Sequence, residues 1–260
     1  MKEKLDKKVR RIDTDIDKLR IKIKDSNSLK LEENVFDEPT LKNLYKLSRK
    51  DFIKELGGSI STGKEANVFY ATGPEKELAI KIYRITTSTF KAMDPYITKD
   101  PRFTNIRHTR RDIVFAWTQK ESQNLKRAIS AGVRAPEPIT TEKNILIMEF
   151  LGENEVPYPQ LKNITLEEED AKRIFEIIVE YMRLLLTKAN LVHADLSEYN
   201  IIIDPNTLEP IIIDMGQSVT LEHPNAREFL YRDVQNILRY FSRYGIKMSP
   251  EELLSKIQAK

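Results

Sequence analysis

The stretch that decides the fold of this 260-residue chain is His193-Ala-Asp-Leu-Ser-Glu-Tyr-Asn200, followed by Ile211-Ile-Ile-Asp-Met-Gly216. Asp195 and Asn200 lie between an expected helix and a short apolar run, so both are expected on a loop that rigid elements hold. Asp214 ends the second isoleucine run. Carboxylate and amide oxygens are ligands that Mg²⁺ prefers. Asn200 and Asp214 are therefore predicted to share a cation, which leaves Asp195 free to orient or deprotonate an attacking hydroxyl.

The order of these residues is typical of protein kinases, in which a catalytic-loop Asp and an Asn precede a metal-binding Asp-x-Gly. Each piece on its own also fits a capped turn. The Arg that usually separates the His and the Asp is replaced here by Ala194. Because the pair occurs in order, each member beside an isoleucine run, the pattern favours phosphoryl transfer from ATP.

Lys81 supplies the basic group that this chemistry needs. It lies in Leu78-Ala-Ile-Lys-Ile-Tyr83, an expected strand, on the same face as Ala79. The small Ala79 leaves room for a flat adenine. Glu121, on the long helix expected over residues 109–131, could pair with Lys81 and hold its amine against the phosphates. The alternative for Glu121 is an exposed helix charge.

The stretch Gly58-Ser-Ile-Ser-Thr-Gly-Lys-Glu65 matches most of a Walker phosphate loop. A Walker loop needs Ser or Thr where Glu65 stands, and it must open a helix, whereas a strand-like run follows here. The Walker interpretation is therefore rejected in favour of a strand–loop–strand flap over the nucleotide. Ser61, Thr62 and Lys64 are the predicted phosphate donors.

Residues 148–152 end a short apolar strand and precede a connector, which is where a kinase places its hinge. The backbone groups of Glu149 and Leu151 are predicted to bond adenine, next to Met148. A plain buried strand would explain the same apolar residues.

The remaining pattern predicts strands before helices, and thus an α+β fold of two lobes: a β-rich N-lobe and a truncated, mostly helical C-lobe. The predicted division is a charged tail (1–39), an N-lobe (40–148) and a C-lobe (149–260). A helix over 41–56 is predicted to be capped by Thr40 and stopped by Gly57 and Gly58. The expected features after it are a long loop without regular structure (84–107), a helix capped by Thr165 and Glu168 and reaching Lys188, and helices over 225–243 and 249–258.

The chain contains no cysteine, which excludes disulfides and zinc–cysteine sites and favours a reducing, cytoplasmic location. It shows no signal-peptide pattern and no apolar run long enough to cross a membrane.

The net charge of +3 is unevenly distributed. Residues 1–30 carry eleven Lys and Arg against six Asp and Glu, and residues 81–134 carry twelve against four. This asymmetry indicates either a polyanion nearby, such as ATP or RNA, or merely solvated surfaces.

The sequence closely resembles the RIO family of atypical serine protein kinases, in its archaeal Rio1 type, over roughly residues 40–258. The resemblance rests on Ser61-Thr-Gly-Lys-Glu-Ala-Asn-Val-Phe69, Lys120-Glu-Ser-Gln-Asn-Leu125, the stretches around Asp195 and Asp214, and Arg232-Asp233. It implies Asp195, Lys81 and Glu121 as catalytic residues, with Asn200 and Asp214 on Mg²⁺, or on Mn²⁺ in its place. The nucleotide-binding set it implies is Ile60, Ser61, Thr62, Lys64, Val68, Ala79, Lys81, Met148, Glu149, Leu151, Asn200 and Ile213.

The resemblance further implies autophosphorylation and a role in maturation of the small ribosomal subunit, with a pre-40S-like precursor as partner. The alternative is an ATPase switch that passes through an aspartyl phosphate at Asp214 and controls release from pre-ribosomes. Only forty-six residues follow Asp214, too few for the usual activation loop and peptide groove. The segment 84–107 is therefore the predicted gate for a substrate or partner.

Overall fold

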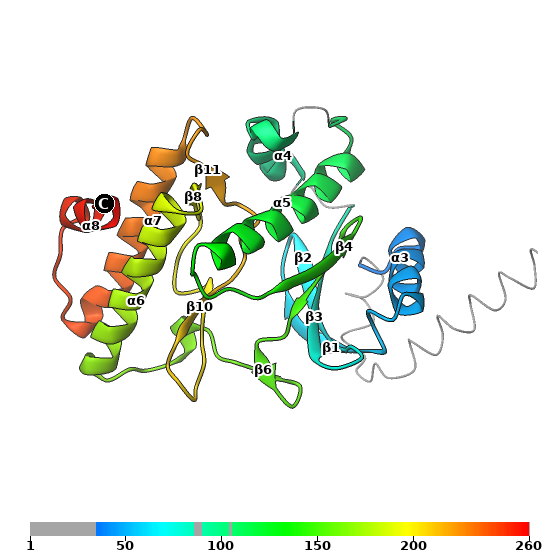
Figure 1. The fold of residues 1–260 in the computed structure, drawn as a ribbon, viewed down its shortest axis with the longest axis horizontal. Helices are drawn as coiled ribbons and strands as arrows, with labels where there is room; N and C mark the ends of the chain where they lie inside the picture. The colour runs from blue at the N-terminus through cyan, green and yellow to red at the C-terminus, as the bar shows by residue number, and fades with distance from the viewer. Residues whose placement is uncertain (1–34, 86–89, 104–105, 260) are drawn as a thin grey trace, which may run out of the picture.

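The structure is a computed structural model that describes residues 35–85, 90–103 and 106–259. The predicted charged tail covers residues 1–39, of which residues 1–34 lie outside the described residues. The end of the predicted tail is ordered, because Val35 is buried in the core under the sheet and a helix begins at Glu38. In the described part, a half rich in strands leads into a helical half (Figure 1), as the sequence predicted. No helix among the described residues is both long and apolar enough to cross a membrane.

The first half is built on a five-stranded antiparallel sheet in the order β1-β2-β3-β5-β4. The strands are β1 (Glu55–Thr62), β2 (Ala66–Thr72), β3 (Glu77–Tyr83), β4 (Pro138–Glu142) and β5 (Ile145–Glu149). Along β3 the side chains alternate: Ile80 and Ile82 join the core under α3, while Ala79 joins a separate cluster with Tyr70 and Phe150. The sheet therefore offers one face to a helix and the other to the space between the lobes.

Helix α3 (Glu38–Arg49) covers the first face of the sheet through Leu44 and Leu47. Its N-cap is Asp37, whose Oδ1 accepts from the backbone N–H of Thr40 at 2.9 Å. The prediction of Thr40 as cap was wrong, because Pro39 already fits the first turn of a helix. Gly57 and Gly58 do not stop this helix but lie inside β1, where the register with β2 shifts between Leu56 and Ser59.

The segment 84–107 is not a structureless loop, which corrects the prediction. It contains α4 (Phe90–Thr98) and a 3₁₀ turn (Pro101–Phe103). Met93, Ile97 and Phe103 pack against the start of α5 (Arg110–Ser130). The apolar residues of α4 could not be read as a helix from the sequence because their partners lie on another helix.

The second half consists of α6 (Glu168–Thr187), α7 (Ala226–Phe241) and α8 (Pro250–Gln258), together with short strand pairs. The strand pairs are β6 (Gly152–Glu153) with β7 (Val156–Pro157), β8 (Leu191–Val192) with β11 (Val219–Thr220), and β9 (Ile201–Ile203) with β10 (Pro210–Ile212). The sequence predicted α7 and α8 within a few residues. It did not predict the start of α6, which has Glu167 as N-cap and no side-chain cap rather than a Thr165 capping box.

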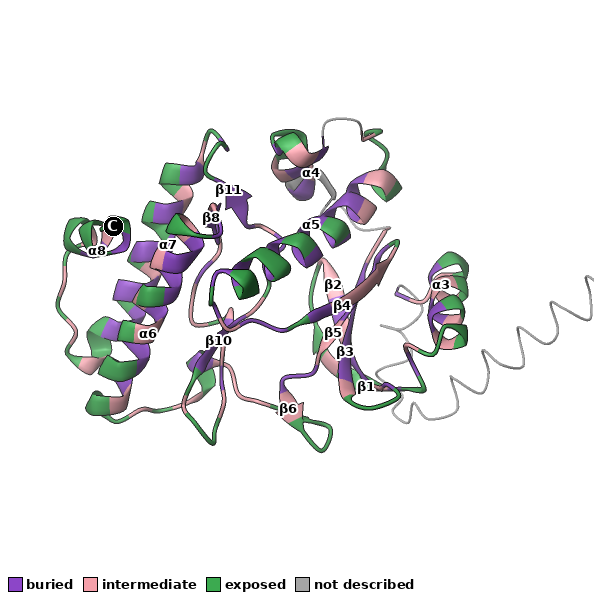
Figure 2. Ribbon diagram, viewed as in Figure 1, coloured by how far each residue is buried: buried purple, intermediate pink, exposed green. Residues whose placement is uncertain are grey.

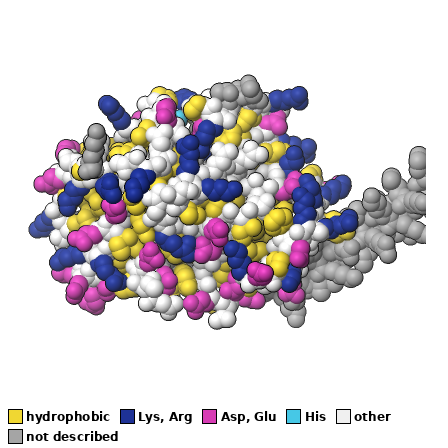
Figure 3. Space-filling view, in the orientation of Figure 1, with side chains coloured by type: hydrophobic (Ala, Val, Ile, Leu, Met, Phe, Trp, Pro, Cys, Tyr) yellow, Lys and Arg dark blue, Asp and Glu magenta, His cyan; other side chains and the backbone are white. Residues whose placement is uncertain are grey.

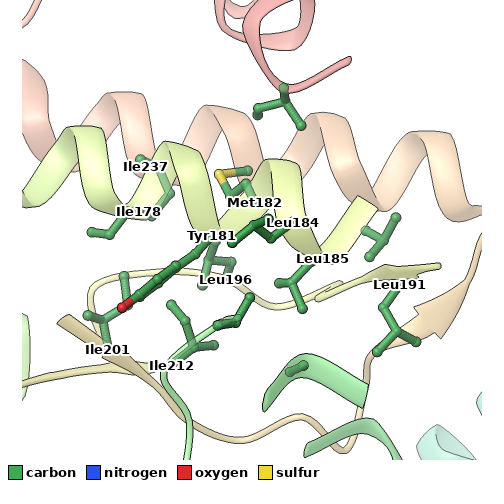
Figure 4. Packing of buried hydrophobic residues seen from close by; sticks show 14 of the residues in the cluster. Ile178, Tyr181, Met182, Leu184, Leu185, Leu191, Leu196, Ile201, Ile212 and Ile237 are labelled. Atoms are coloured by element: carbon green, nitrogen blue, oxygen red, sulfur yellow. The ribbon is translucent and has the colours of Figure 1, made fainter. Parts of the chain in front are cut away.

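The helices of this half bury their facing sides and expose their outer sides (Figure 2). Ile178, Tyr181 and Leu185 of α6 lie over Leu196, Ile201 and Ile212, which flank the segments carrying Asp195, Asn200 and Asp214 (Figure 4). Burying a side chain of this size contributes about 1.5–3 kcal/mol. The core of this half is thus the rigid support on which the catalytic segments rest.

Candidate active site

Lys81 is the point at which the two halves meet. Its Nζ lies 2.8 Å from Oε1 of Glu121 on α5 and 2.9 Å from Oδ1 of Asp214, just after β10. Burial would lower the pKa of Lys81, but the carboxylates of Asp214 and Glu121 outweigh it and raise the pKa. Burial raises the pKa of Glu121 to about 7, against the opposing pull of Lys81. Lys81 therefore stays charged between two carboxylates.

One carboxylate oxygen of Asp214 accepts from the Lys81 ammonium, and the Asp214 side chain remains 47% exposed. Burial alone would raise its pKa, but the charge and hydrogen bond of Lys81 hold the pKa below its usual range. Its backbone adopts the left-handed region, with φ of 61°, which Asp tolerates better than most residues. The result is an ionised carboxylate that solvent can reach.

Asp195 and Asn200 form the opposite wall of the site. Asn200 Nδ2 donates to the backbone carbonyl of Asp195 at 2.8 Å and to its Oδ2 at 3.0 Å. The backbone N–H of Ile213 donates to the carbonyl of Asn200 at 3.0 Å, which joins this loop to the segment of Asp214. Burial and the charge of Asp214 raise the pKa of Asp195, with the Asn200 hydrogen bond opposing.

His193 belongs to the scaffold of this loop. Burial lowers its pKa to about 4, so the ring is neutral. Its Nε2 lies 3.1 Å from the carbonyl of Ile213, and its Nδ1 lies 3.3 Å from the backbone N–H of Asp195. These partners fix the tautomer, with Nε2 donating and Nδ1 accepting. His193 thus ties the catalytic loop to the segment that precedes Asp214.

Asp233 on α7 holds the backbone of the catalytic loop, a role that was not predicted from the sequence. Its carboxylate accepts from the N–H of Ala194 at 2.8 Å and of Leu196 at 2.9 Å. Ala194 has a φ of 68°, a strained conformation for this residue, and Asp233 is 1% exposed. Two buried N–H groups and a strained turn therefore depend on one side chain.

Replacing Asp233 by Ala is expected to lower the free energy of unfolding by about 2 kcal/mol or more, because two buried N–H groups lose their acceptor. Urea unfolding measures the change. Gln235→Ala, an exposed position on the same helix, is the control and is expected to unfold like the parent. Equal stability of the Asp233→Ala variant and the parent would contradict this role.

Four of the predicted adenine-facing residues share one apolar cluster. Ile60, Val68 and Met148 pack against Tyr70, Ala79 and Phe150. Val68 on β2 is the register partner of Lys81 on β3, so this cluster borders Lys81. The fifth residue, Ile213, does not belong to the cluster and lies partly exposed next to Asp214.

The hinge has fewer backbone groups for adenine than the sequence suggested. The N–H of Glu149 donates to the carbonyl of Glu137 at 2.9 Å, and the carbonyl of Leu151 accepts from Tyr158 at 2.9 Å. The N–H of Glu149 and the carbonyl of Leu151 are therefore already engaged within the protein. The Glu149 carboxylate is held by Arg134 at 2.6 and 2.8 Å, which fixes the start of the hinge.

Ser61, Thr62 and Lys64 lie exposed at the turn between β1 and β2, where Gly63 N–H donates to the carbonyl of Ala66 at 2.9 Å. The turn confirms a strand–loop–strand flap instead of a Walker helix. Glu65, in the same turn, was not predicted as a site residue. Burial raises its pKa, the charges of Asp214 and Asp195 add to this effect, and Lys81 opposes it, so Glu65 lies within electrostatic range of the catalytic carboxylates.

Tyr96 and Gln217 were also missed, since no sequence signal links them. The hydroxyl of Tyr96 on α4 lies 3.3 Å from Oε1 of Gln217, and Nε2 of Gln217 lies 3.4 Å from Oδ2 of Asp195. The Tyr96 ring also stacks on Phe229 of α7 at 5.6 Å. The 84–107 segment is therefore linked to the carboxylate of Asp195 through Tyr96 on α4 and Gln217.

The donor set suits a divalent cation that arrives together with phosphate. Asn200 turns its Nδ2 toward Asp195, which leaves its Oδ1 to join a carboxylate oxygen of Asp214 as hard ligands. Among the described residues there is no group of three His, Cys, Asp or Glu that could hold a metal by itself. Two oxygen ligands beside a phosphate site fit Mg²⁺, which usually keeps water and substrate oxygens as further ligands.

An antiparallel sheet carrying a Lys–Glu pair, joined to a helical half with an Asp, an Asn and a second Asp on its loops, defines the protein-kinase class. Comparison with known proteins identifies the branch. Residues 67–253 match the family model described as the RIO domain. The chain belongs to the RIO family of serine/threonine protein kinases, in its Rio1 type.

Similar proteins come from archaea and eukaryotes. The RIO-type serine/threonine-protein kinase Rio1 of Haloferax volcanii is 44% identical over 96% of this chain and 85% of its own length. Its namesake in Methanocaldococcus jannaschii is 40% identical over 89% and 78%. Human serine/threonine-protein kinase RIO1 is 39% identical over 86% of this chain but only 40% of its own length.

A solved structure supports the fold. The Rio2 kinase–ADP/Mg²⁺–phosphoaspartate complex from Chaetomium thermophilum aligns with a TM-score of 0.62 at 23% identity, over 84% of this chain and 65% of that chain. The two-lobed kinase-like fold predicted from the sequence is thereby confirmed.

Proposed function

We propose that the chain uses ATP and Mg²⁺ to phosphorylate serine or threonine hydroxyls of proteins, its own among them. The observation that carries this proposal is the Lys81 ammonium, which is bonded both to Glu121 and to Asp214. A kinase needs this pair and the metal-binding Asp in place together.

The proposed roles follow from the contacts of each residue. Lys81 binds the phosphates, and Glu121 keeps its amine in place. Asn200 and Asp214 hold the cation, which when bound neutralises charge on the transferred phosphoryl group. Asp195 accepts the proton of the incoming hydroxyl, a task that its raised pKa favours.

On the nucleotide side, adenine lies against Ile60, Val68, Ala79, Met148 and Ile213. The carbonyl of Glu149 and the N–H of Leu151 bond its edge, and Ser61, Thr62 and Lys64 donate to the phosphates. The end of β5 at Glu149 supports the proposed division into an N-lobe up to residue 148 and a C-lobe from 149.

A precursor of the small ribosomal subunit is the proposed partner, by resemblance to the family. Lys and Arg are interspersed with Asp and Glu over the face in Figure 3. Several of the Lys and Arg side chains gather toward the side that carries α3. Arg107 and Arg111 at the start of α5 are exposed. Such surfaces fit the phosphates of RNA. The 84–107 segment is the proposed gate for a substrate or partner, and Tyr96 is its contact with Gln217 beside Asp195.

The alternative activity is ATP hydrolysis through an aspartyl phosphate at Asp214. It is favoured by the 47% exposure of the Asp214 side chain and by the phosphoaspartate in the Chaetomium thermophilum Rio2 complex. Both activities use one site and differ only in where the phosphoryl group goes.

Labelled ATP distinguishes the two activities. A kinase is expected to leave label that survives acid and is insensitive to hydroxylamine, because a serine phosphate is an ester. An acyl phosphate is expected to lose its label to hydroxylamine. No transfer to any protein and no hydrolysis, from folded protein with Mg²⁺, would contradict both.

A further inference from the structure

One face of α5 is polar and completely buried. Trp117, Lys120 and Asn124 are spaced three and four residues apart and therefore share a face of the helix. Lys120 and Asn124 are 0% exposed, and Trp117 is 2% exposed. This face lies against residues 215–218, the segment that follows Asp214.

Two side chains hold the carbonyls of that segment. Lys120 Nζ donates to the carbonyl of Gly216 at 2.8 Å and also to that of Ser218. Asn124 Nδ2 donates to the carbonyls of Met215 at 2.9 Å and Ser218 at 3.0 Å. Three of the four carbonyls that follow Asp214 are thus fixed by one helix.

The fit leaves no room for adjustment at Gly216. A Cβ at this position would lie 2.7 Å from Nε1 of Trp117. The segment therefore approaches α5 so closely that only a glycine is accommodated, and the two donors reach its backbone directly.

Burying an ammonium only to fill space would be unfavourable, since an apolar side chain does so without loss of solvation. Burial lowers the pKa of Lys120 to about 7, with Asp100 favouring the charge and Arg102 opposing it. The rings of Trp117 and Tyr96 lie 5.4 and 5.9 Å from Nζ and partly replace its water. The carbonyl oxygens of Gly216 and Ser218 likewise take the place of water around Nζ.

We propose that Lys120 and Asn124 are positioning residues that hold the backbone of residues 215–218, and with it the Asp214 carboxylate, in the place from which a divalent cation is bound. This inference rests on the proposed function, since it takes Asp214 as a metal ligand. Glu121 lies between the two positioning residues in the sequence. The single helix α5 therefore determines the position of the Lys81 amine as well as that of the segment after Asp214. A shift of α5 would release both groups together.

The decisive measurement is the affinity for Mn²⁺, followed by electron paramagnetic resonance in the presence of a non-hydrolysable ATP analogue. Lys120→Met removes the donor and keeps an unbranched side chain. It is expected to weaken Mn²⁺ binding about 10-fold or more, as loss of groups that orient a metal ligand does. The kcat should fall with it, while the KM for ATP changes little. Lys126→Met, the same change at an exposed position of α5, should match the parent.

Asn124→Asp provides a second variant in case Lys120→Met does not fold. It keeps the acceptor for Arg102, which donates to Asn124 Oδ1 at 3.0 Å, but removes the donor to Met215 and Ser218. The same weakening of Mn²⁺ binding is expected. Parental Mn²⁺ affinity in whichever of the two variants folds would overturn the inference.

Asp214→Asn separates this inference from the proposed function. If Asp214→Asn weakens Mn²⁺ binding and the α5 variants do not, only the positioning role fails. If Asp214→Asn binds Mn²⁺ like the parent, the metal assignment in the proposed function fails, and the positioning inference that rests on it fails as well.

Discussion

Replacing Asp195 by Asn is expected to slow phosphoryl transfer by about 10²–10⁴-fold, the usual contribution of a positioned proton acceptor. The amide keeps the size of the side chain and can still accept from Asn200 Nδ2, which lies 3.0 Å away in the parent. It cannot accept a proton from a hydroxyl. The rate of label transfer from ATP measures the effect.

ATP binding is the control measurement for this variant. Because Asp195 acts on the nucleophile and not on the nucleotide, its loss should lower kcat while the affinity for ATP with Mg²⁺ stays within about threefold. Asp51→Asn, an exposed Asp in a left-handed conformation that Asn tolerates, should behave like the parent. Transfer at the parental rate by Asp195→Asn would show that another group accepts the proton.

Replacing Asp214 by Asn is expected to have a comparable effect for a different reason. The left-handed backbone at this position suits Asn, so the fold should survive. The variant loses a charged metal ligand, and the contribution of a metal to phosphoryl transfer is several kcal/mol. Transfer should fall about 10²–10⁴-fold, and unlike Asp195→Asn, this variant should also need more Mg²⁺.

The chemistry of the label sharpens this second test. If Asp214 accepts the phosphoryl group, the hydroxylamine-sensitive label of the parent disappears in Asp214→Asn, and it stays absent when longer incubation and higher Mg²⁺ offset the slower transfer. If the Asp214→Asn variant still carries label that hydroxylamine removes, another carboxylate is the acceptor. Glu65, whose pKa responds to the charges of Asp214 and Asp195, is then the first residue to replace. Equal Mg²⁺ dependence of the variant and the parent would contradict the role of Asp214 as a ligand.

The elements that depend on a local pattern could be predicted from the amino-acid sequence. The alternation in β3 placed Lys81 and Ala79 on one face with Ile80 and Ile82 on the other, and the structure bears this out. The isoleucine runs at 201–203 and 211–213 predicted the paired strands β9 and β10. Spacing along a strand or around a turn fixes the direction of a side chain, so such features can be read without the fold.

Helix starts were less well determined, because several polar residues near a start can cap it. Asp37 rather than Thr40 caps α3, and α6 begins without any side-chain cap. In α4, the apolar residues Met93 and Ile97 gain their partners only from α5. Whether such a segment becomes helical depends on burial against a distant element, which a local pattern does not encode.

Contacts between charged groups that are far apart in the sequence became evident from the packing of the fold. Lys81 and Asp214 are 133 residues apart, and Lys120 contacts the backbone of Gly216 and Ser218 from another element. In the sequence, Lys120 is one of many lysines, and Asp233 one of many acids. The energy of a buried charge depends on the partners that replace its water, and these partners exist only when distant segments pack together.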